Sequence, residues 1–566
     1  MPFTAAVSLT SDLRAAVDGA IKAWEAGGNT KRLWARDASL WTNSGEDKWL
    51  GWLDIIDSQL ADPGRFQTIA SDVQAAGFTD AVVLGMGGSS LCPDVLSKTF
   101  GQTLSFPRLH VLDSTVPAQV LALERRVNLG KTLFIVASKS GSTLEPSIFL
   151  KYFYERCKHN GAQFYAITDP GSKLQASATQ DGFAKVFFGI PEIGGRFSAM
   201  SDFGMVPAAV MGMDVVKLLN GAQQMVEACM AESTSQNPGV EMGIVMGTLA
   251  NLGRNKLTIL SSPKLSSLGA WQEQLVAEST GKVGKGIIPV DGEPLIDPAH
   301  YGPDRLFVYQ RLEGDDNDTL DAFAKALADA GQPVIRIPLR NRHQLGAEFF
   351  RWEIATAVAG SVIGIDAFNQ PDVEFSKVEA RKLTTAFEET GKLPEEAPAL
   401  EEDGIKLYGD TKAATLAGAL AAHFSDIQPL KVSNDHVTQA GYVALLAYIE
   451  MTDAHQARLQ AMRQRILEKT RAATCVGFGP RFLHSTGQAY KGGPAGGLFL
   501  QITSDDAEDA PVPGQKYSFG IVKAAQAQGD LEVLRSRGRR SLRIHLGADV
   551  TGGLKKLALA VDHALQ

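Results

Sequence analysis

Short apolar segments alternate with helical periods along most of this 566-residue chain, and this alternation limits the possible folds more than any other feature. The segments are rich in β-branched and aromatic residues, as buried strands are, and the stretches between them carry apolar residues at helical spacing. Repeated strand–helix units build parallel sheets covered by helices, so we expect an α/β fold. The expected strands are 81–84, 109–112, 133–137, 163–168 and 185–188 in a first series, and 257–260, 306–310 and 334–338 in a second.

The two series of strands predict how the chain is organised. We expect two doubly wound parallel-sheet subdomains and then a C-terminal α/β region, separated from them by an acidic, proline-containing linker. The expected boundaries are 1–49 for an N-terminal helical segment, 50–235 and 236–387 for the subdomains, 388–404 for the linker, and 405–566 for the C-terminal region.

The C-terminal region has a less regular pattern. Residues 441–470 are largely helical in period, and 498–503, 518–522 and 542–546 have the composition of strands. Residues 505–514 (DDAEDAPVPG) are expected to form a surface loop. A basic stretch near the end fits either a solvated face or an anion site; it contains Arg535, Arg537, Arg539, Arg540 and Arg543.

Composition is that of a globular protein with its own core. The formal net charge of −8 disfavours a general nucleic-acid binder. No apolar run is long enough for a membrane span, and residues 1–19 lack the apolar centre of a secretory signal. Four cysteines without CxxC spacing favour isolated thiols in a reducing compartment over a disulfide or zinc framework, so we expect a cytoplasmic protein; they are Cys92, Cys157, Cys229 and Cys475.

Residues 138–145 (SKSGSTLE) join an expected buried strand to an expected helix. Backbone N–H groups at a helix start, several hydroxyls and one ammonium group could converge there on a single dianion such as a phosphate. The alternative is an ordinary helix cap, since Ser and Thr commonly precede helices. The side chains concerned are Ser138, Lys139, Ser140, Ser142 and Thr143.

Residues 82–94 (VVLGMGGSSLCPD) form a second junction of this kind. Gly87 and Gly88 would let the backbone approach a ligand, and Ser89 would offer a hydroxyl. The spacing is not that of a dinucleotide-binding fingerprint, and a tight strand-to-helix turn is the alternative.

Three further segments complete an ordered set: IGGRFS at 193–198, QLVAESTGK at 274–282 and FNQPDVEFSK at 368–377. Together the five segments resemble the sugar-isomerase (SIS) domains of the glucose-6-phosphate isomerase family, most closely the isomerase half of bacterial bifunctional transaldolase/glucose-6-phosphate isomerase proteins. The resemblance runs from about residue 31 to the C-terminus. Asn369 and Asp372 depart from the Asp and Gly usual in the family. Nothing resembles a transaldolase barrel, so we expect a single activity.

The resemblance implies an aldose–ketose isomerase that interconverts D-glucose 6-phosphate and D-fructose 6-phosphate through a cis-enediolate, in glycolysis and gluconeogenesis. It implies a sugar phosphate substrate, a homodimer, and no metal or redox cofactor. Dual action on mannose 6-phosphate is the alternative within enzymes. Outside enzymes the alternative is a sugar-phosphate-sensing module, because such domains also occur in regulators. Those regulators usually lack the base, arginine and lysine that this sequence contains.

The family's catalytic residues map onto this chain. By resemblance, Glu278 is the base that moves the proton between C2 and C1, and Arg196 stabilises the enediolate oxygens. Gln274 is four residues before Glu278 in an expected helix, so the two share a face. A solvated helical glutamate and a surface salt-bridged arginine are the ordinary alternatives.

Lys377 matches the family lysine near the ring oxygen, and Gln370 the glutamine that holds sugar hydroxyls. The two are seven residues apart, two helical turns, and Pro371 would begin that helix. By the same resemblance Glu145 lies close to the sugar, and the phosphate is bound by Ser138, Lys139, Ser140 and Thr143, with Gly88 and Ser89 nearby.

The histidine that most of the family uses in ring opening is missing from its usual stretch, here 301–310. His300, His343 and His484 are candidates for the role. We favour His484, because its segment combines glycine turns with several polar residues in a loop of the kind that forms sites. A merely structural role for His484, or action by Lys377 alone, stays open.

Overall fold

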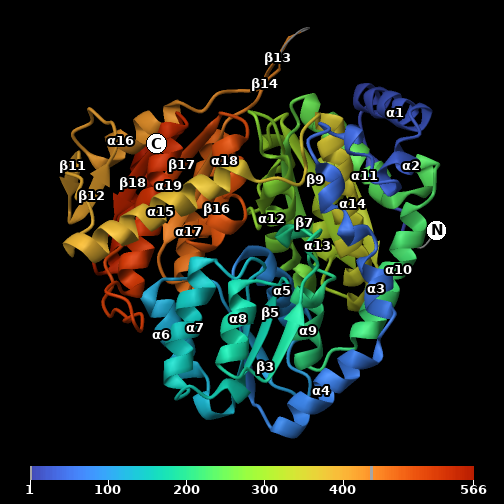
Figure 1. Ribbon diagram of the computed structural model, residues 1–566. Helices are drawn as coiled ribbons and strands as arrows, with labels where there is room; N and C mark the ends of the chain where they lie inside the picture. The colour runs from blue at the N-terminus through green and yellow to red at the C-terminus, as the bar shows by residue number, and fades with distance from the viewer. Residues whose placement is uncertain (1–2, 434–436) are drawn as a thin grey trace.

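A computed structural model describes residues 3–433 and 437–566, and in it three α/β bodies meet at the centre of the molecule (Figure 1). Each body is built on one sheet, and the three sheets follow one another along the chain, apart from one N-terminal strand. The α/β architecture expected from the alternating pattern is therefore confirmed.

The first sheet has five parallel strands in the order β3-β2-β4-β5-β6. Its central strands are buried on both faces, which explains their continuous apolar sequences. The two polar turns predicted from sequence follow neighbouring strands β2 and β4, so both lie at the carboxyl edge of the sheet, where ligands bind in such folds. The strands are β2 (Asp80–Gly85), β3 (Arg108–Leu112), β4 (Thr132–Ala137), β5 (Phe164–Thr168) and β6 (Lys185–Phe188).

The second sheet has the order β1-β10-β9-β7-β8, with β1 antiparallel to the rest. The N-terminal segment is helical as expected but also supplies β1, which covers the edge of β10. A strand of three residues is too short to show a period in the sequence. The strands are β1 (Ala6–Ser8), β7 (Lys256–Ser261), β8 (Ile288–Asp291), β9 (Arg305–Leu312) and β10 (Val334–Leu339), and the N-terminal helices are α1 (Ser11–Ala26) and α2 (Asn29–Trp34).

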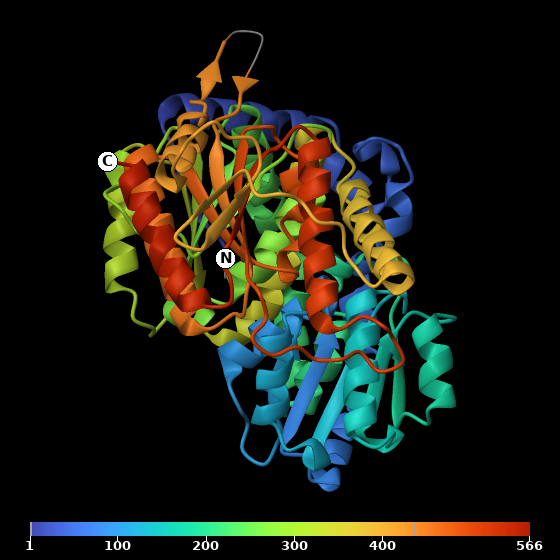
Figure 2. The same cartoon turned by 90° about the vertical axis from the view of Figure 1, so that its left-hand side faces the viewer.

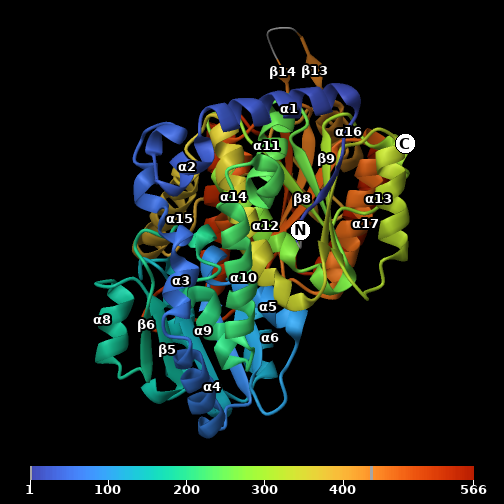
Figure 3. The ribbon, with the colours of Figure 1, turned by 90° about the vertical axis from the view of Figure 1, so that its right-hand side faces the viewer.

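A layer of apolar helices beside the second sheet joins it to the first. Helix α14 (Leu345–Ile363) is buried along almost its whole length and packs against α10 (Val215–Cys229) and α11 (Pro238–Asn251), as Figure 3 shows. The largest hydrophobic cluster contains residues of both sheets and of these helices, so the first two bodies share one core.

The third sheet has six strands in the order β11-β12-β18-β17-β15-β16, with the last four parallel (Figure 2). Its strands are β11 (Leu400–Glu402), β12 (Ile405–Tyr408), β15 (Tyr442–Tyr448), β16 (Ala473–Phe478), β17 (Gly497–Thr503) and β18 (Arg540–His545). The helices around it are α15 (Pro371–Thr390), α16 (Leu416–Ser425), α17 (Asp453–Thr470), α18 (Gly487–Gly492), α19 (Phe519–Ser536) and α20 (Val550–Ala564), and β13 (Lys431–Val432) pairs with β14 (Val437–Thr438) in a separate hairpin.

Several C-terminal expectations were wrong. Residues 518–522 are not a strand but the start of α19, where the Ser518 hydroxyl accepts a hydrogen bond from the Ile521 N–H. Residues 441–470 are not all helical, since strand β15 precedes α17. This strand was missed because it is buried on both faces and so lacks the alternation of apolar and polar residues that marks a half-buried strand. Part of the acidic linker pairs as β11 with β12.

The loop 505–514 was also expected at the surface, and part of it is buried instead. Ala510 and Val512 pack into the cluster on the outer face of the first sheet, together with Phe519 and Val522 of α19. The C-terminal region therefore completes a core that begins more than 300 residues earlier in the chain.

Candidate active site

A cavity of about 250 Å³ lies where the first and third bodies meet α15. It is lined by hydroxyls of the 138–143 loop and by charged and polar side chains from α7 (Leu144–Arg156), α15, α19 and the short 3₁₀ helix Arg481–His484. Its polar lining residues are Ser140, Ser142, Thr143, Glu145, Lys377, Arg381, His484 and Gln526.

The loop after β4 gathers its hydroxyls at the start of α7. Gly141 has a φ of +64°, and a Cβ there would lie 2.6 Å from the Leu174 nitrogen, so glycine permits this tight turn. Ser140 and Ser142 hydroxyls lie 2.9 Å apart, and the Ser138 and Thr143 hydroxyls 3.4 Å apart. This arrangement is suited to an anion, because the hydroxyls and the first N–H groups of a 13-residue helix lie together.

The two cations near this loop differ in their surroundings. The Lys139 ammonium is ion-paired with Asp169 and donates to the Pro191 carbonyl at 3.1 Å, and Lys139 is not among the residues that line the cavity. Arg381 is exposed and lines the cavity one helical turn after Lys377, and its guanidinium has no hydrogen bond or ion pair with the described residues. Arg381 was not predicted from the sequence, because its position four residues after Lys377 does not distinguish it from a solvated helical arginine.

The Gly87-Gly88 turn brings three segments into close contact. A Cβ on Gly88 would lie 1.9 Å from the Gly195 carbonyl oxygen, next to Arg196. Gly87 has a φ of +55°, and a Cβ there would lie 2.8 Å from both Gln274 Nε2 and the His484 carbonyl oxygen. Ser89 is buried beside them. These glycines thus allow backbone packing around the residues predicted to be catalytic.

Glu278 lies on α12 (Leu268–Thr280) in a buried setting, with 5% of its surface exposed. Its carboxylate is 3.6 Å from the Arg196 guanidinium and accepts a hydrogen bond of 3.4 Å from Gln274 Nε2. Burial raises the pKa of the Glu278 carboxyl, and the nearby cations Arg196 and Lys377, together with His484, offset this shift in part. A base with a raised pKa suits proton abstraction near neutral pH.

Arg196 is 1% exposed and held from every side, unlike a surface salt bridge. Its guanidinium donates to the Ser279 hydroxyl at 2.7 Å, to Gln370 Oε1 at 2.6 Å and to the Ala367 carbonyl at 2.7 Å. It also donates to the main-chain carbonyl of Asn369, the position where the family usually has Asp. This contact does not depend on which side chain stands there.

The second departure, Asp372, contacts the C-terminal region. Its carboxylate accepts a hydrogen bond of 2.7 Å from Gln488 and lies 2.7 Å from the Arg537 guanidinium. A glycine at this position would have no side chain for either contact. Aspartate in place of the family's usual glycine therefore gives residue 372 two contacts with residues 405–566.

Of the three candidate histidines, His484 lies at the cavity. Its Nε2 is 2.9 Å from Glu145 Oε1, and its carbonyl accepts from Gln274 Nε2 at 2.8 Å. Burial favours the neutral form of Glu145, but His484, a main-chain hydrogen bond and the Lys377 charge together lower the pKa of that carboxyl. His300 is exposed, and His343 packs against Phe100 with ring centroids 5.2 Å apart.

Ion pairs hold the His484 segment on the first body. Arg481, three residues before His484, contacts Asp94 at 2.6 Å and Asp113 at 3.1 Å. Gln526 of α19 donates to Glu145 Oε1 at 2.7 Å and accepts from the Thr115 hydroxyl at 2.6 Å. Neither Gln526 nor Thr115 carries a sequence signal, since their partners lie hundreds of residues away.

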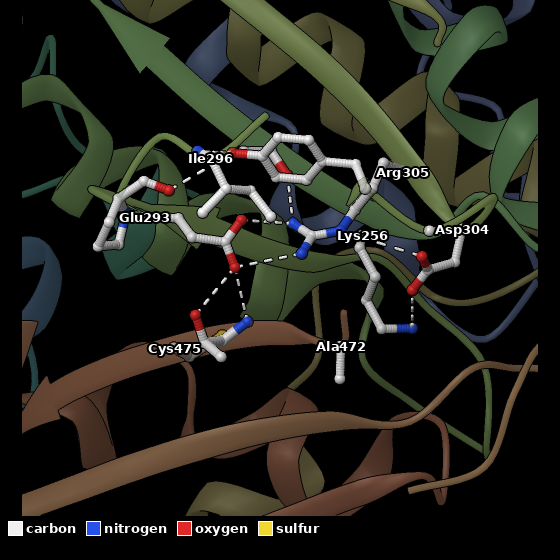
Figure 4. Close-up of polar contacts among 12 residues, drawn as sticks. Lys256, Glu293, Ile296, Asp304, Arg305, Ala472 and Cys475 are labelled. Carbon is white, nitrogen blue, oxygen red and sulfur yellow. Dashed lines mark hydrogen bonds and ion pairs between the residues drawn. The ribbon is translucent and has the colours of Figure 1, made fainter. Parts of the chain in front are cut away.

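A buried charge network holds the C-terminal region on the second sheet (Figure 4). The Arg305 guanidinium contacts Glu293 at 2.6 Å, and Glu293 in turn accepts from the Thr474 N–H and hydroxyl at 2.8 and 2.9 Å. Lys256 donates to the Ala440 carbonyl at 2.9 Å and lies 3.8 Å from Asp304. The two cations are fully buried, so these partners are needed to hold their charge.

In residues 3–433 and 437–566, no group of three or more His, Cys, Asp or Glu side chains is arranged to hold a metal ion. Within the same ranges, no helix has the length and apolar character needed to cross a bilayer.

Comparison with known proteins adds independent evidence. Residues 68–290 match the family described as phosphoglucose isomerase. The glucose-6-phosphate isomerase of Rubrobacter xylanophilus is 32% identical, covering 55% of this chain and 83% of that protein, and one from Thermus thermophilus is 30% identical, covering 59% and 89%. A solved structure of a hypothetical protein, also from Thermus thermophilus, is 27% identical and superposes with a TM-score of 0.56, over 67% of this chain and 99% of that one.

Proposed function

This chain belongs to the glucose-6-phosphate isomerase family, and we propose that it interconverts D-glucose 6-phosphate and D-fructose 6-phosphate with Glu278 as the base. The observation that carries the proposal is the buried Glu278 carboxylate, with its raised pKa, beside Arg196 and Gln274. A solvated helical glutamate would have none of these properties.

The proposed reaction moves one proton between two carbons and a second between two oxygens. Glu278 takes the proton from C2 of the open-chain aldose, and an enediolate forms. The proton of the C2 hydroxyl passes to the C1 oxygen, and the same carboxyl returns the first proton to C1, which leaves the carbonyl at C2. Negative charge then builds on the enediolate oxygens. The guanidinium of Arg196, fixed by Ser279 and Gln370, supplies a permanent positive charge that needs no reorganisation as this charge develops.

Ring opening must precede that step, because the cyclic sugar has no free carbonyl. We assign it to His484 with Lys377, which line the same cavity. Glu145 Oε1, 2.9 Å from His484 Nε2, orients the imidazole ring, and in its protonated form His484 can donate to the ring oxygen.

Substrate binding follows from the same cavity. The Ser140 and Thr143 hydroxyls and the start of α7 are suited to the phosphate, and Arg381 lines the same cavity. The Ser138 hydroxyl lies 3.4 Å from that of Thr143, just behind them. Gln370 remains our proposal for holding sugar hydroxyls, and Lys139 for the phosphate loop through its ion pair with Asp169.

Two alternatives differ in what supports them. A sugar-phosphate-binding regulator is less well supported, because the base, arginine and lysine are all present, and Arg196 and Glu278 are buried together. Mannose 6-phosphate stays open as an additional substrate. We also propose a cytoplasmic location and a homodimer, as in the family resemblance.

The decisive experiment is a coupled assay of fructose 6-phosphate conversion. Glu278→Gln should lower kcat by about 10³-fold with little change in KM, because a base acts in the transition state. Solvent deuterium exchange at C2 should vanish with it. The control is Glu227→Gln on the exposed face of α10, which should retain wild-type rates. C2 exchange that persists in Glu278→Gln would exclude Glu278 as the base.

A further inference from the structure

A hydrogen-bonded chain of four side chains crosses from the first body to the C-terminal region at the active site. It runs from Thr115 through Gln526 to Glu145 and ends at His484, with distances of 2.6, 2.7 and 2.9 Å. We propose that Gln526 is a positioning residue for ring opening: it fixes the Glu145 carboxylate, which holds His484 with Nδ1 toward the sugar. This inference rests on the proposed function.

The direction of every bond in the chain follows from chemistry. An ionised carboxylate only accepts hydrogen bonds, so Gln526 must turn its amide N–H toward Glu145. That leaves the amide oxygen of Gln526 to face Thr115, whose hydroxyl donates to it. Gln526 is 3% exposed and Thr115 is fully buried, so both bonds are largely shielded from bulk water.

The same reasoning shows which ring nitrogen of His484 carries a hydrogen toward Glu145. Glu145 Oε1 accepts from both Gln526 Nε2 and His484 Nε2, so the His484 hydrogen at Nε2 is always present. Within the described residues, no group is hydrogen-bonded to His484 Nδ1, and His484 lines the cavity. Nδ1 is therefore the nitrogen that exchanges a proton with the substrate.

Ring opening moves one proton from the anomeric hydroxyl to the ring oxygen of the sugar, with His484 as the carrier. The imidazolium gives its Nδ1 proton to the ring oxygen as the bond from that oxygen to the anomeric carbon breaks. The anomeric hydroxyl becomes the carbonyl and releases its proton, which restores the imidazolium. Glu145 stays ionised throughout and stabilises the imidazolium, provided that Gln526 keeps the carboxylate in place.

The chain also makes the C-terminal region part of the active site. Both Gln526 and His484 belong to that region, while Thr115 and Glu145 belong to the first body. Ring opening should then depend on residues that the phosphoglucose isomerase match at 68–290 does not include.

Ring opening can be measured without C2 proton transfer. An opened ring can close to either anomer, so exchange between α- and β-glucose 6-phosphate, followed by NMR, reports this step alone. In a Glu278→Gln background, Gln526→Met should slow anomer exchange by about tenfold or more, the effect of losing one hydrogen bond to a charged group. In a protein that keeps Glu278, Gln526→Met should change the KM for fructose 6-phosphate less than twofold.

The isosteric Gln526→Glu separates positioning from packing. At neutral pH it sets a second carboxylate against Glu145 and should be slower than Gln526→Met. As pH falls, its protonated carboxyl can donate to Glu145, so the ratio of the Gln526→Glu rate to the Gln526→Met rate should rise. A residue that only fills space would give a constant ratio. The matched control is Gln528→Glu, two residues along α19, whose side chain points to the Pro394 carbonyl.

The outcomes separate the two proposals. Anomer exchange at the wild-type rate in Gln526→Met, or a pH-independent ratio, overturns the role of Gln526 while isomerase activity stands. A wild-type chain that neither exchanges anomers nor converts fructose 6-phosphate overturns the proposed function itself.

Discussion

At the scale of single residues, the pKa of Glu278 links burial to activity. Burial raises this pKa and Arg196 lowers it. The base must be ionised, so activity is lost as pH falls through its pKa. Arg196→Met should therefore move the acid limb of the kcat/KM profile to higher pH, besides lowering kcat. Profiles of kcat/KM against pH for both proteins test this, since they report the free enzyme. Coincident acid limbs would show that Arg196 does not act on Glu278.

The cations beside the phosphate loop give a second prediction at this scale. Arg381→Met should raise the KM for fructose 6-phosphate and the Ki of inorganic phosphate about tenfold or more, as expected for a charge-assisted contact. Lys139→Met should have a smaller effect, because that ammonium is paired with Asp169. Lys382→Met on the same helix is the control. The reverse order of effects would return the phosphate contact to Lys139.

Resemblance to the family's motifs predicted several of these site residues. Arg196 and Gln370 were predicted from the GGRFS and FNQPDVEFSK segments, and the structure joins their side chains across 174 positions in the chain. Arg381 and Gln526 could not be found in this way. Their surroundings are set by the docking of distant elements, and a lone Arg or Gln on a helix carries no pattern.

At the scale of elements, the Gly87-Gly88 turn gives a stability prediction. Gly88→Ala would place a Cβ against the Gly195 backbone, which cannot move aside as a flexible side chain could. We expect a cost of about 3 kcal/mol from overpacking, with a lower thermal midpoint and reduced kcat. Gly19→Ala in α1 is the matched control, because its Cβ meets nothing within 4 Å. It should be neutral or stabilising by up to about 1 kcal/mol. Equal midpoints for the two variants would contradict this packing role.

The elements also show where the sequence pattern was sufficient. Eight of the ten strands of the first two sheets were predicted, because each contains an apolar run bounded by turn residues. Strands β1 and β8 were not predicted: β1 has only three residues, and β8 has four, one of them a proline. The 518–522 segment failed because Ile521 and Val522 are β-branched yet lie in the first turn of α19. There the Ser518 cap and burial against the first body outweigh the preference of these residues for strands.

At the scale of the whole molecule, the buried network of Figure 4 predicts a strong coupling between the second sheet and the C-terminal region. Glu293→Ala would remove the carboxylate nearest the buried Arg305 guanidinium, leaving Asp304 3.9 Å from its Nε, and should cost about 3–5 kcal/mol. The double variant Glu293→Met with Arg305→Met removes both charges and should be less destabilised. Thermal unfolding of the three proteins measures this. A double variant as unstable as Glu293→Ala would show that packing, not the unpaired charge, sets the cost.

The C-terminal region covers the outer face of the first sheet, and this has a consequence for synthesis of the protein. Phe149 of α7 stacks on Phe519 of α19, with ring centroids 6.0 Å apart, and their positions differ by 370 in the chain. A ribosome adds ~5–20 residues per second. Roughly 20–70 s therefore pass between synthesis of the first sheet and synthesis of the residues that cover its outer face. During that interval its apolar surface is open to water and to other nascent chains. The nascent protein should accordingly depend on chaperones until α19 emerges from the ribosome.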